Sequence, residues 1–168
     1  MSTRLARELK TLCLKPTPAL RLAVAESLTG GQVQAAITAV PGASAFFLGG
    51  LTAYSIDQKV KLLGVNRAAA KRVNSVSAAV ATQMARGVAE LFGSDLAVAT
   101  TGYAEPAAEF GVADPFAYWA IAHRVSPRRW QVLTGQVVCP GQKRTEVQAT
   151  VAEIVLAELV DYLKTIAP

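Results

Sequence analysis

The fold is decided by the stretch Ala23-Val24-Ala25-Glu26-Ser27-Leu28-Thr29-Gly30-Gly31. An apolar run over residues 20–25 predicts a buried strand that ends here, and residues 32–40 follow with helical character. A strand that passes directly into a helix leaves free backbone N–H groups at the helix start, and these can receive an anionic group. The same residue types are also typical of a helix N-cap and a tight turn. Both interpretations of the stretch stay open at this level.

Apolar periodicity extends the prediction outward along the chain. It predicts further helices over residues 4–14, 56–63, 78–92 and 145–165, a short helix or turn over 67–73, and strands over 21–25, 45–54, 95–100, 116–123 and 130–138. Thr29 is expected to cap the helix that reaches about residue 39. A connection of four or five residues is expected to join the last two strands as a hairpin. Strands interleaved with helices predict one α/β domain over residues 1–168, with a mixed sheet covered by helices on both faces.

Composition excludes several classes of protein. Of the 168 residues, 52% are apolar and 17% are charged, which indicates a globular chain rather than a disordered one. No apolar run is long enough to span a membrane, and the N-terminus lacks the apolar block of a signal peptide, so we expect a cytoplasmic protein without a membrane partner. Cys13 and Cys139 have no metal-ligand spacing, and His123 is the single histidine, so no metal site is expected.

The net charge of +5 comes from basic residues that are spread along the chain. A nucleic-acid surface would need a basic stripe interleaved with exposed aromatic side chains, and no such pattern is present. An anionic small molecule or a merely soluble surface explains the charge equally well. The expected partner is therefore a small-molecule substrate and not a nucleic acid.

Polar side chains follow three of the predicted strands. They are Glu26-Ser27 with Thr29-Gly30-Gly31, Tyr54-Ser55 followed by Lys59, and Thr100-Thr101-Gly102. In open α/β sheets ligands bind beyond the carboxyl ends of the strands. If these three ends converge, they form a pocket that contains hydroxyls, a phenol, a carboxylate and an amine.

No histidine lies in these segments, so a nucleophilic Ser27 would need another base, and Lys59 is the natural candidate. A free lysine has a pKa of about 10.4, which is too high for a base at neutral pH, but burial can lower that pKa by several units. Tyr54 could relay a proton or orient the lysine. The alternative for Lys59 is a solvated helix lysine, as is expected of Lys61.

Several motifs together resemble those of one known family. They are Ala25-Glu26-Ser27-Leu28-Thr29-Gly30-Gly31, Pro41-Gly42-Ala43-Ser44, Phe47 with Gly49-Gly50, Ala53-Tyr54-Ser55 with Lys59, Leu62-Leu63-Gly64-Val65, Val76-Ser77 and Thr101-Gly102. In this order they resemble the CinA carboxyl-terminal domain family, which includes nicotinamide-nucleotide amidohydrolases, also called NMN deamidases. The resemblance runs over nearly the whole chain. It implies a compact α/β domain, often homo-oligomeric, that here stands alone.

The resemblance also implies a reaction and a set of site residues. Ser27 and Lys59 correspond to a catalytic dyad that acts on the carboxamide of a nicotinamide nucleotide and releases ammonia, with Tyr54 beside them. No cofactor is implied. The substrate-binding residues implied are Glu26, Thr29, Gly30, Gly31, Thr101, Gly102 and Arg144. Backbone N–H groups of residues 29–31 could hold either the oxyanion or the phosphate of the ligand.

The chain departs from the family pattern around the expected pocket. Leu28 stands where the family usually has cysteine. The family continues from Thr-Gly into a glycine-rich loop, whereas residues 103–109 are bulkier and include Glu105 and Glu109. Two added carboxylates would repel a phosphate unless they face away from it. The usual Lys-Pro-Val-Gly-Thr also begins with Asp114 here, so an anion replaces a cation.

A further departure lies at the last helix, where the usual Gly-Asp-Arg reads Gly141-Gln142-Lys143-Arg144, so either Lys143 or Arg144 could supply the family cation. These changes keep two alternatives open beside the amidohydrolase of a nicotinamide nucleotide. One is a related hydrolase with a less anionic or a cationic amide substrate. The other is a catalytically altered or inactive relative that binds a different small ligand or a protein partner.

Overall fold

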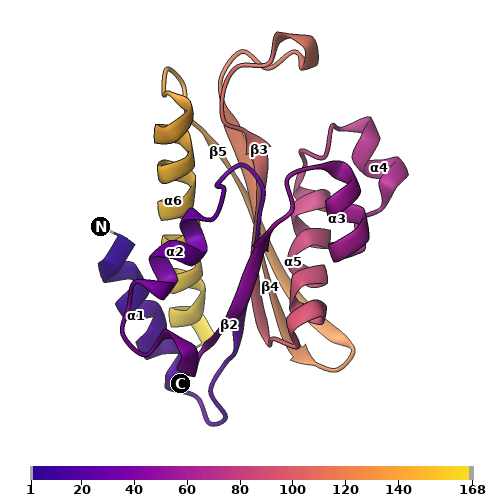
Figure 1. Ribbon diagram of the computed structural model, residues 1–168. Coiled ribbons are helices and arrows are strands. Elements are labelled where there is room, and N and C mark those ends of the chain that lie inside the picture. Colours follow the sequence, from indigo (N-terminus) through magenta and orange to yellow (C-terminus); the bar gives the residue numbers. More distant parts are fainter. Residues whose placement is uncertain (1, 167–168) are drawn as a thin grey trace.

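Five strands form one mixed sheet in the computed structural model, which describes residues 2–166 (Figure 1). The strands are β1 (Leu22–Glu26), β2 (Phe47–Thr52), β3 (Leu96–Tyr103), β4 (Phe116–Ser126) and β5 (Arg129–Val138). Their order across the sheet is β2-β1-β3-β4-β5. β1 runs parallel to both β2 and β3, whereas β3, β4 and β5 are antiparallel neighbours. The predicted mixed sheet is confirmed.

Helices cover both faces of the sheet, as predicted (Figure 1). One face carries α1 (Ser2–Leu14), α2 (Gln32–Thr38) and α6 (Arg144–Ile166), and the other carries α3 (Ile56–Leu63), α4 (Arg67–Arg72) and α5 (Ala78–Phe92). Two short 3-10 helices, η1 (Ala43–Ala45) and η2 (Ala108–Phe110), lie in the connections before β2 and β4. None of the helices within residues 2–166 combines the length and apolar character that a bilayer crossing requires.

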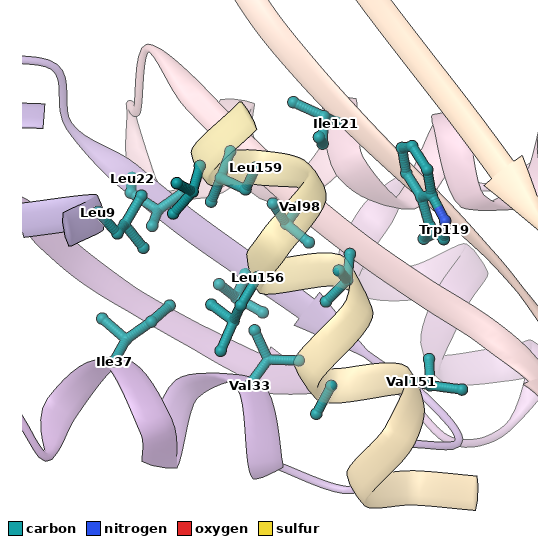
Figure 2. Close-up of a cluster of buried hydrophobic side chains, with 14 of the residues drawn as sticks. Leu9, Leu22, Val33, Ile37, Val98, Trp119, Ile121, Val151, Leu156 and Leu159 are labelled. Carbon is teal, nitrogen blue, oxygen red and sulfur yellow. The ribbon is translucent and has the colours of Figure 1, made fainter. Parts of the chain in front are cut away.

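The two faces of the sheet differ in side-chain size because alternate strand residues point to opposite faces. On β1, Leu22 and Val24 join the core beneath α6, while Ala23 and Ala25 join the core beneath α5. Figure 2 shows large side chains packed around α6. On the other face small alanines let α5 lie close to the strands, where it contacts β1, β3 and β4.

The start of α2 differs from the prediction. Thr29 does not cap the helix, because the N-cap position is Gly31, which has a φ of 104° and no side-chain cap of its own. The Thr29 hydroxyl instead lies 2.7 Å from the hydroxyl of Thr100 on β3. The helix needs no threonine cap because Glu26, at the end of β1, accepts hydrogen bonds from the N–H groups of its first turn.

Several strand boundaries also differ from the prediction. β2 is shorter than residues 45–54, since a 3-10 helix precedes it. β3 continues beyond residue 100 to Tyr103 because it stays paired with β4 as far as Phe116. The hairpin connection is shorter than expected, because Ser126 and Arg129 are paired and only Pro127 and Arg128 form the turn.

A glycine on α5 lets two helices meet at backbone distance. A Cβ at Gly87 would come within 2.1 Å of the carbonyl oxygen of Leu63, the last residue of α3. The carbonyl cannot turn away easily because it belongs to the helix backbone. This close contact holds α3 against α5.

Gly87→Ala is expected to lower the free energy of unfolding by about 1–3 kcal/mol, because the added methyl group must push α3 away from α5. The sign is informative, since an alanine in a helix interior without such a contact stabilises by roughly 0.5–1 kcal/mol. Urea denaturation measures the change. Glu90→Ala, at an exposed position of the same helix, serves as the control and should stay within about 0.5 kcal/mol. A stabilised Gly87→Ala variant would contradict the close contact.

Candidate active site

The three predicted polar segments meet at one edge of the sheet, where the parallel strands β1, β2 and β3 end. A pocket of about 370 Å³ lies there. This volume is within the usual range for small-molecule sites. The predicted site residues that line it are Ser27, Tyr54, Lys59, Thr101, Gly102 and Arg144. The sheet topology therefore brings together residues that are far apart in the sequence.

Ser27 and Lys59 are in direct contact inside this pocket. The Lys59 ammonium Nζ donates a hydrogen bond to Ser27 Oγ at 2.9 Å and a second one to the Tyr54 carbonyl oxygen at 3.1 Å. Lys59 is only 3% exposed and Ser27 only 6%. The alternative of a solvated helix lysine is therefore wrong for Lys59, whereas Lys61 is exposed.

The local sequence explains how α3 presents its lysine. Ser55 caps the helix by accepting a hydrogen bond from the N–H of Gln58, so α3 begins directly after Tyr54. Lys59 then lies one turn into the helix, on the side that faces β1. Leu63 follows at the next turn and is buried against α5, which anchors the same side of the helix.

Burial lowers the pKa of Lys59 from 10.5 to about 8. The cause is desolvation, which penalises the charged ammonium. Within residues 2–166 Lys59 forms no ion pair that would oppose this effect. A pKa near 8 leaves about a tenth of the amine neutral at pH 7, and a neutral amine can accept the proton of a hydroxyl group.

Glu26 is placed next to the pocket but not in it. Its carboxyl oxygens accept hydrogen bonds from the backbone N–H groups of Gly31, Val33 and Gln34, at 2.9, 3.2 and 3.0 Å. The side chain is fully buried, so the structure does not offer it to a substrate. The expectation that the start of α2 is free to receive a ligand anion is also wrong, because Glu26 already occupies that position.

Thr29, Gly30 and Gly31 build the turn that carries Ser27 and do not line the pocket. The N–H of Gly30 donates to the carbonyl of Ser27 at 3.2 Å, and that of Gly31 donates to Glu26. Thr29 is fully buried against Thr100. The predicted tight turn is therefore present. These three residues do not form a surface that a substrate in the pocket would contact.

Thr101 and Gly102 line the pocket at the end of β3. The Thr101 hydroxyl donates to the carbonyl of Ser75 at 2.7 Å, in the connection between α4 and α5. Asn74 and Ser75 both have positive φ, 46° and 60°, a conformation that residues other than glycine rarely adopt. The sequence analysis did not expect Asn74 and Ser75 in the pocket wall, although the motif Val76-Ser77 lies in the same connection and Val76 also lines the pocket.

Arg144, and not Lys143, is the basic residue of the last helix that lines the pocket. Its Nη1 donates to Glu105 Oε1 at 2.6 Å and its Nη2 donates to the Tyr54 hydroxyl. Tyr54 therefore contacts Lys59 through its carbonyl and Arg144 through its phenol. Among the described residues no hydrogen bond joins the phenol to Ser27 or Lys59, so the expected proton relay has no direct path in this structure.

The remaining walls come from the segment that follows β3. Tyr103, at the end of β3, and Glu105, Glu109 and Phe110 line the pocket. Of the acidic residues noted in the sequence, Glu105 and Glu109 therefore face the site, whereas Asp114 does not line it. The aromatic rings of Tyr103 and Phe110 lie 5.8 Å apart and add an apolar surface. No cluster of three or more potential metal ligands occurs within residues 2–166.

The sequence profile described as the CinA C-terminal domain matches residues 3–163. The chain belongs to this family. A crystal structure of a CinA superfamily protein from Klebsiella pneumoniae superposes with a TM-score of 0.88 at 27% identity, over 98% of this chain and 99% of that one. The competence/damage-inducible protein CihA from Agrobacterium tumefaciens gives a TM-score of 0.81 at 29% identity, over 97% and 95% of the two chains.

Curated CinA-like proteins are similar to this chain over part of its length. One from Chlorobium limicola is 51% identical over 92 residues, and one from Geobacter metallireducens is 48% identical over 87 residues. These stretches are 55% and 52% of this chain but 21% of each relative. The CinA domain described here thus aligns with only about a fifth of these longer proteins.

Glu26→Gln is expected to lower the free energy of unfolding by about 1–3 kcal/mol. The amide has one acceptor oxygen in place of two, so at least one buried N–H of α2 loses its partner, and the favourable interaction with the helix dipole is weakened. Urea denaturation measures the change. Glu158→Gln, on the exposed side of α6, is the matched control and should shift stability by less than about 0.5 kcal/mol. Equal effects of the two substitutions would contradict the capping role.

Proposed function

We propose that this CinA-family protein is an amidohydrolase that removes ammonia from the carboxamide of a nicotinamide nucleotide. The observation that carries the proposal is the buried contact of 2.9 Å between Lys59 Nζ and Ser27 Oγ. A serine held by a lysine of lowered pKa is an arrangement that activates a hydroxyl as a nucleophile. The resemblance of the motifs to nicotinamide-nucleotide amidohydrolases supports the choice of amide.

The reaction follows from the two side chains. Neutral Lys59 takes the proton of the Ser27 hydroxyl while Oγ attacks the amide carbon. The protonated lysine then gives this proton to the departing nitrogen, so ammonia leaves and an ester to Ser27 remains. Water hydrolyses the ester with Lys59 as the base, which releases the carboxylic acid and restores the serine. No cofactor enters any of these steps.

The oxyanion requires a hydrogen-bond donor near Ser27. The N–H groups of Gly30 and Gly31 are already used inside the turn. Leu28 lines the pocket, and among the described residues its N–H has no protein acceptor. The N–H of the residue that follows a nucleophile is a common oxyanion donor, so we assign this role to Leu28.

The rest of the pocket suits a pyridine nucleotide in size and chemistry. Tyr103 and Phe110 offer aromatic surface for the ring, and the Arg144 guanidinium is the natural partner of a phosphate. Thr101 and Gly102 supply the wall at the end of β3. Glu26, Thr29, Gly30 and Gly31 contribute indirectly, because they shape the turn that presents Ser27.

One observation favours a second candidate function. Glu105 already pairs with Arg144, the cation that a nucleotide phosphate would use. A non-catalytic relative that binds a different small ligand or a protein partner would be consistent with this occupied cation. The two candidates are distinguished by turnover, since only the amidohydrolase requires the Ser27 hydroxyl for its activity.

Incubation of the protein with nicotinamide mononucleotide is expected to release ammonia and the corresponding acid, measured by an ammonia assay and chromatography. Ser27→Ala should lower kcat by about a thousandfold or more, and Lys59→Met by about a hundredfold or more. Lys61→Met is the matched control, because Lys61 is exposed on the same helix, and its rate should be unchanged. No ammonia from the folded wild-type protein, or full activity of Ser27→Ala, would refute the proposal.

The rate is also expected to rise with pH until Lys59 has lost its proton. Only neutral Lys59 can accept the serine proton, and burial lowers its pKa to about 8. Below this pH kcat/KM should therefore fall by about tenfold per pH unit, and above it the rate should level off. Initial rates between about pH 6 and about pH 10 test this. A rate that is flat, or that falls as pH rises through 8, would exclude Lys59 as the base.

A further inference from the structure

Arg144 links two walls of the pocket mouth. It is the first residue of α6, and its guanidinium reaches Glu105 in the segment after β3 and the phenol of Tyr54 before α3. Both outer nitrogens of the guanidinium are therefore engaged by groups of the protein itself. The ion pair with Glu105 has an N–O distance of 2.6 Å.

The other charges of the pocket make this pair important. Of the residues described as lining it, the cations are Lys59 and Arg144 and the anions are Glu105 and Glu109. Lys59 is buried and bonded to Ser27 and Tyr54. Arg144 is thus the one lining cation placed at the mouth, where an anionic end of a substrate would lie, and Glu105 holds it.

We propose that Glu105 is a specificity-determining residue, whose carboxylate competes with the phosphate of a substrate for the Arg144 guanidinium. The proposal rests on the amidohydrolase function proposed above. A phosphate that approaches Arg144 must either displace the Glu105 carboxylate or lie beside it against charge repulsion, whereas a pyridinium carboxamide without phosphate meets no such competition. Glu105 therefore shifts the preference of the enzyme away from nucleotides and toward substrates that lack the phosphate.

Exposure sets the size of the effect. The side chains of Arg144 and Glu105 are 42% and 62% exposed, so water screens their attraction and the carboxylate can swing out. Glu105 accordingly weakens the binding of a phosphate to Arg144 but does not prevent it. Removing its charge should change the KM of a phosphorylated substrate by about fivefold to tenfold. The catalytic dyad lies deeper in the pocket and is not touched by Glu105.

The test compares nicotinamide mononucleotide with nicotinamide riboside, which lacks the phosphate, in steady-state ammonia release. Glu105→Gln should lower the KM of the nucleotide by about fivefold to tenfold, while kcat for both substrates and the KM of the riboside stay within about twofold. Asp114→Asn is the matched control, because it removes the same charge from the same segment outside the pocket lining. It should alter neither KM by more than about twofold.

An unchanged KM for the nucleotide in Glu105→Gln, or equal changes for both substrates, would overturn the proposal. A second measurement, which does not depend on turnover, tests the competition separately from the proposed amidohydrolase function. The dissociation constant of inorganic phosphate, measured by NMR titration, should fall in Glu105→Gln and not in Asp114→Asn. If the wild-type protein releases no ammonia, the amidohydrolase function fails, and tighter phosphate binding in Glu105→Gln still supports the competition. Equal dissociation constants for phosphate in the wild-type protein and in Glu105→Gln would refute the competition.

Discussion

The buried carboxyl group of Glu26 organises the part of the molecule on which the site depends. It ends β1 and accepts hydrogen bonds from three backbone N–H groups at the start of α2, so it joins the strand directly to the helix. Ser27 follows directly and is turned toward the pocket, while Gly30 and Gly31 supply the positive φ values that the tight turn requires. The α6 side chain Gln148 holds the Leu28 carbonyl at 2.9 Å, which fixes the turn from its other side.

The second constraint is the burial of Lys59. Folding lowers its pKa from 10.5 to about 8, so the folded state disfavours the ammonium relative to the unfolded chain. Lys59 therefore lowers the free energy of unfolding by an amount on the order of 3 kcal/mol below pH 8, and this destabilisation of the folded state disappears as pH rises toward 10.5. The packing of α3 against α5 at Gly87 maintains this burial. Burial of Lys59 thus lowers the stability at neutral pH. The same burial gives an amine whose pKa is low enough for it to act as a base.

The mouth of the pocket and its interior are stabilised by different interactions. Ser27 and Lys59 are buried in the interior, whereas the segment after β3 brings Glu105 and Glu109 to the rim. Because Arg144 spans the rim to Glu105 and Tyr54, the outer wall is held by charge and hydrogen bonds that water can compete with. The inner part of the pocket, which contains Ser27 and Lys59, is stabilised by the burial of its side chains. Changes in substrate preference are therefore expected at the rim first.

The sequence by itself determined the α/β class, the helices and strands within a few residues, and the three polar strand ends, because apolar periodicity and turn residues act locally. It also identified Ser27 and Lys59 as partners, through their residue types and the family motifs. Only the tertiary structure decided that Glu26 caps α2, that Thr29 pairs with Thr100, and that Arg144 rather than Lys143 reaches the pocket. These outcomes depend on which side chain reaches a given donor or acceptor across 5 to 90 residues of chain. Such long-range competition leaves no periodic signal in the sequence.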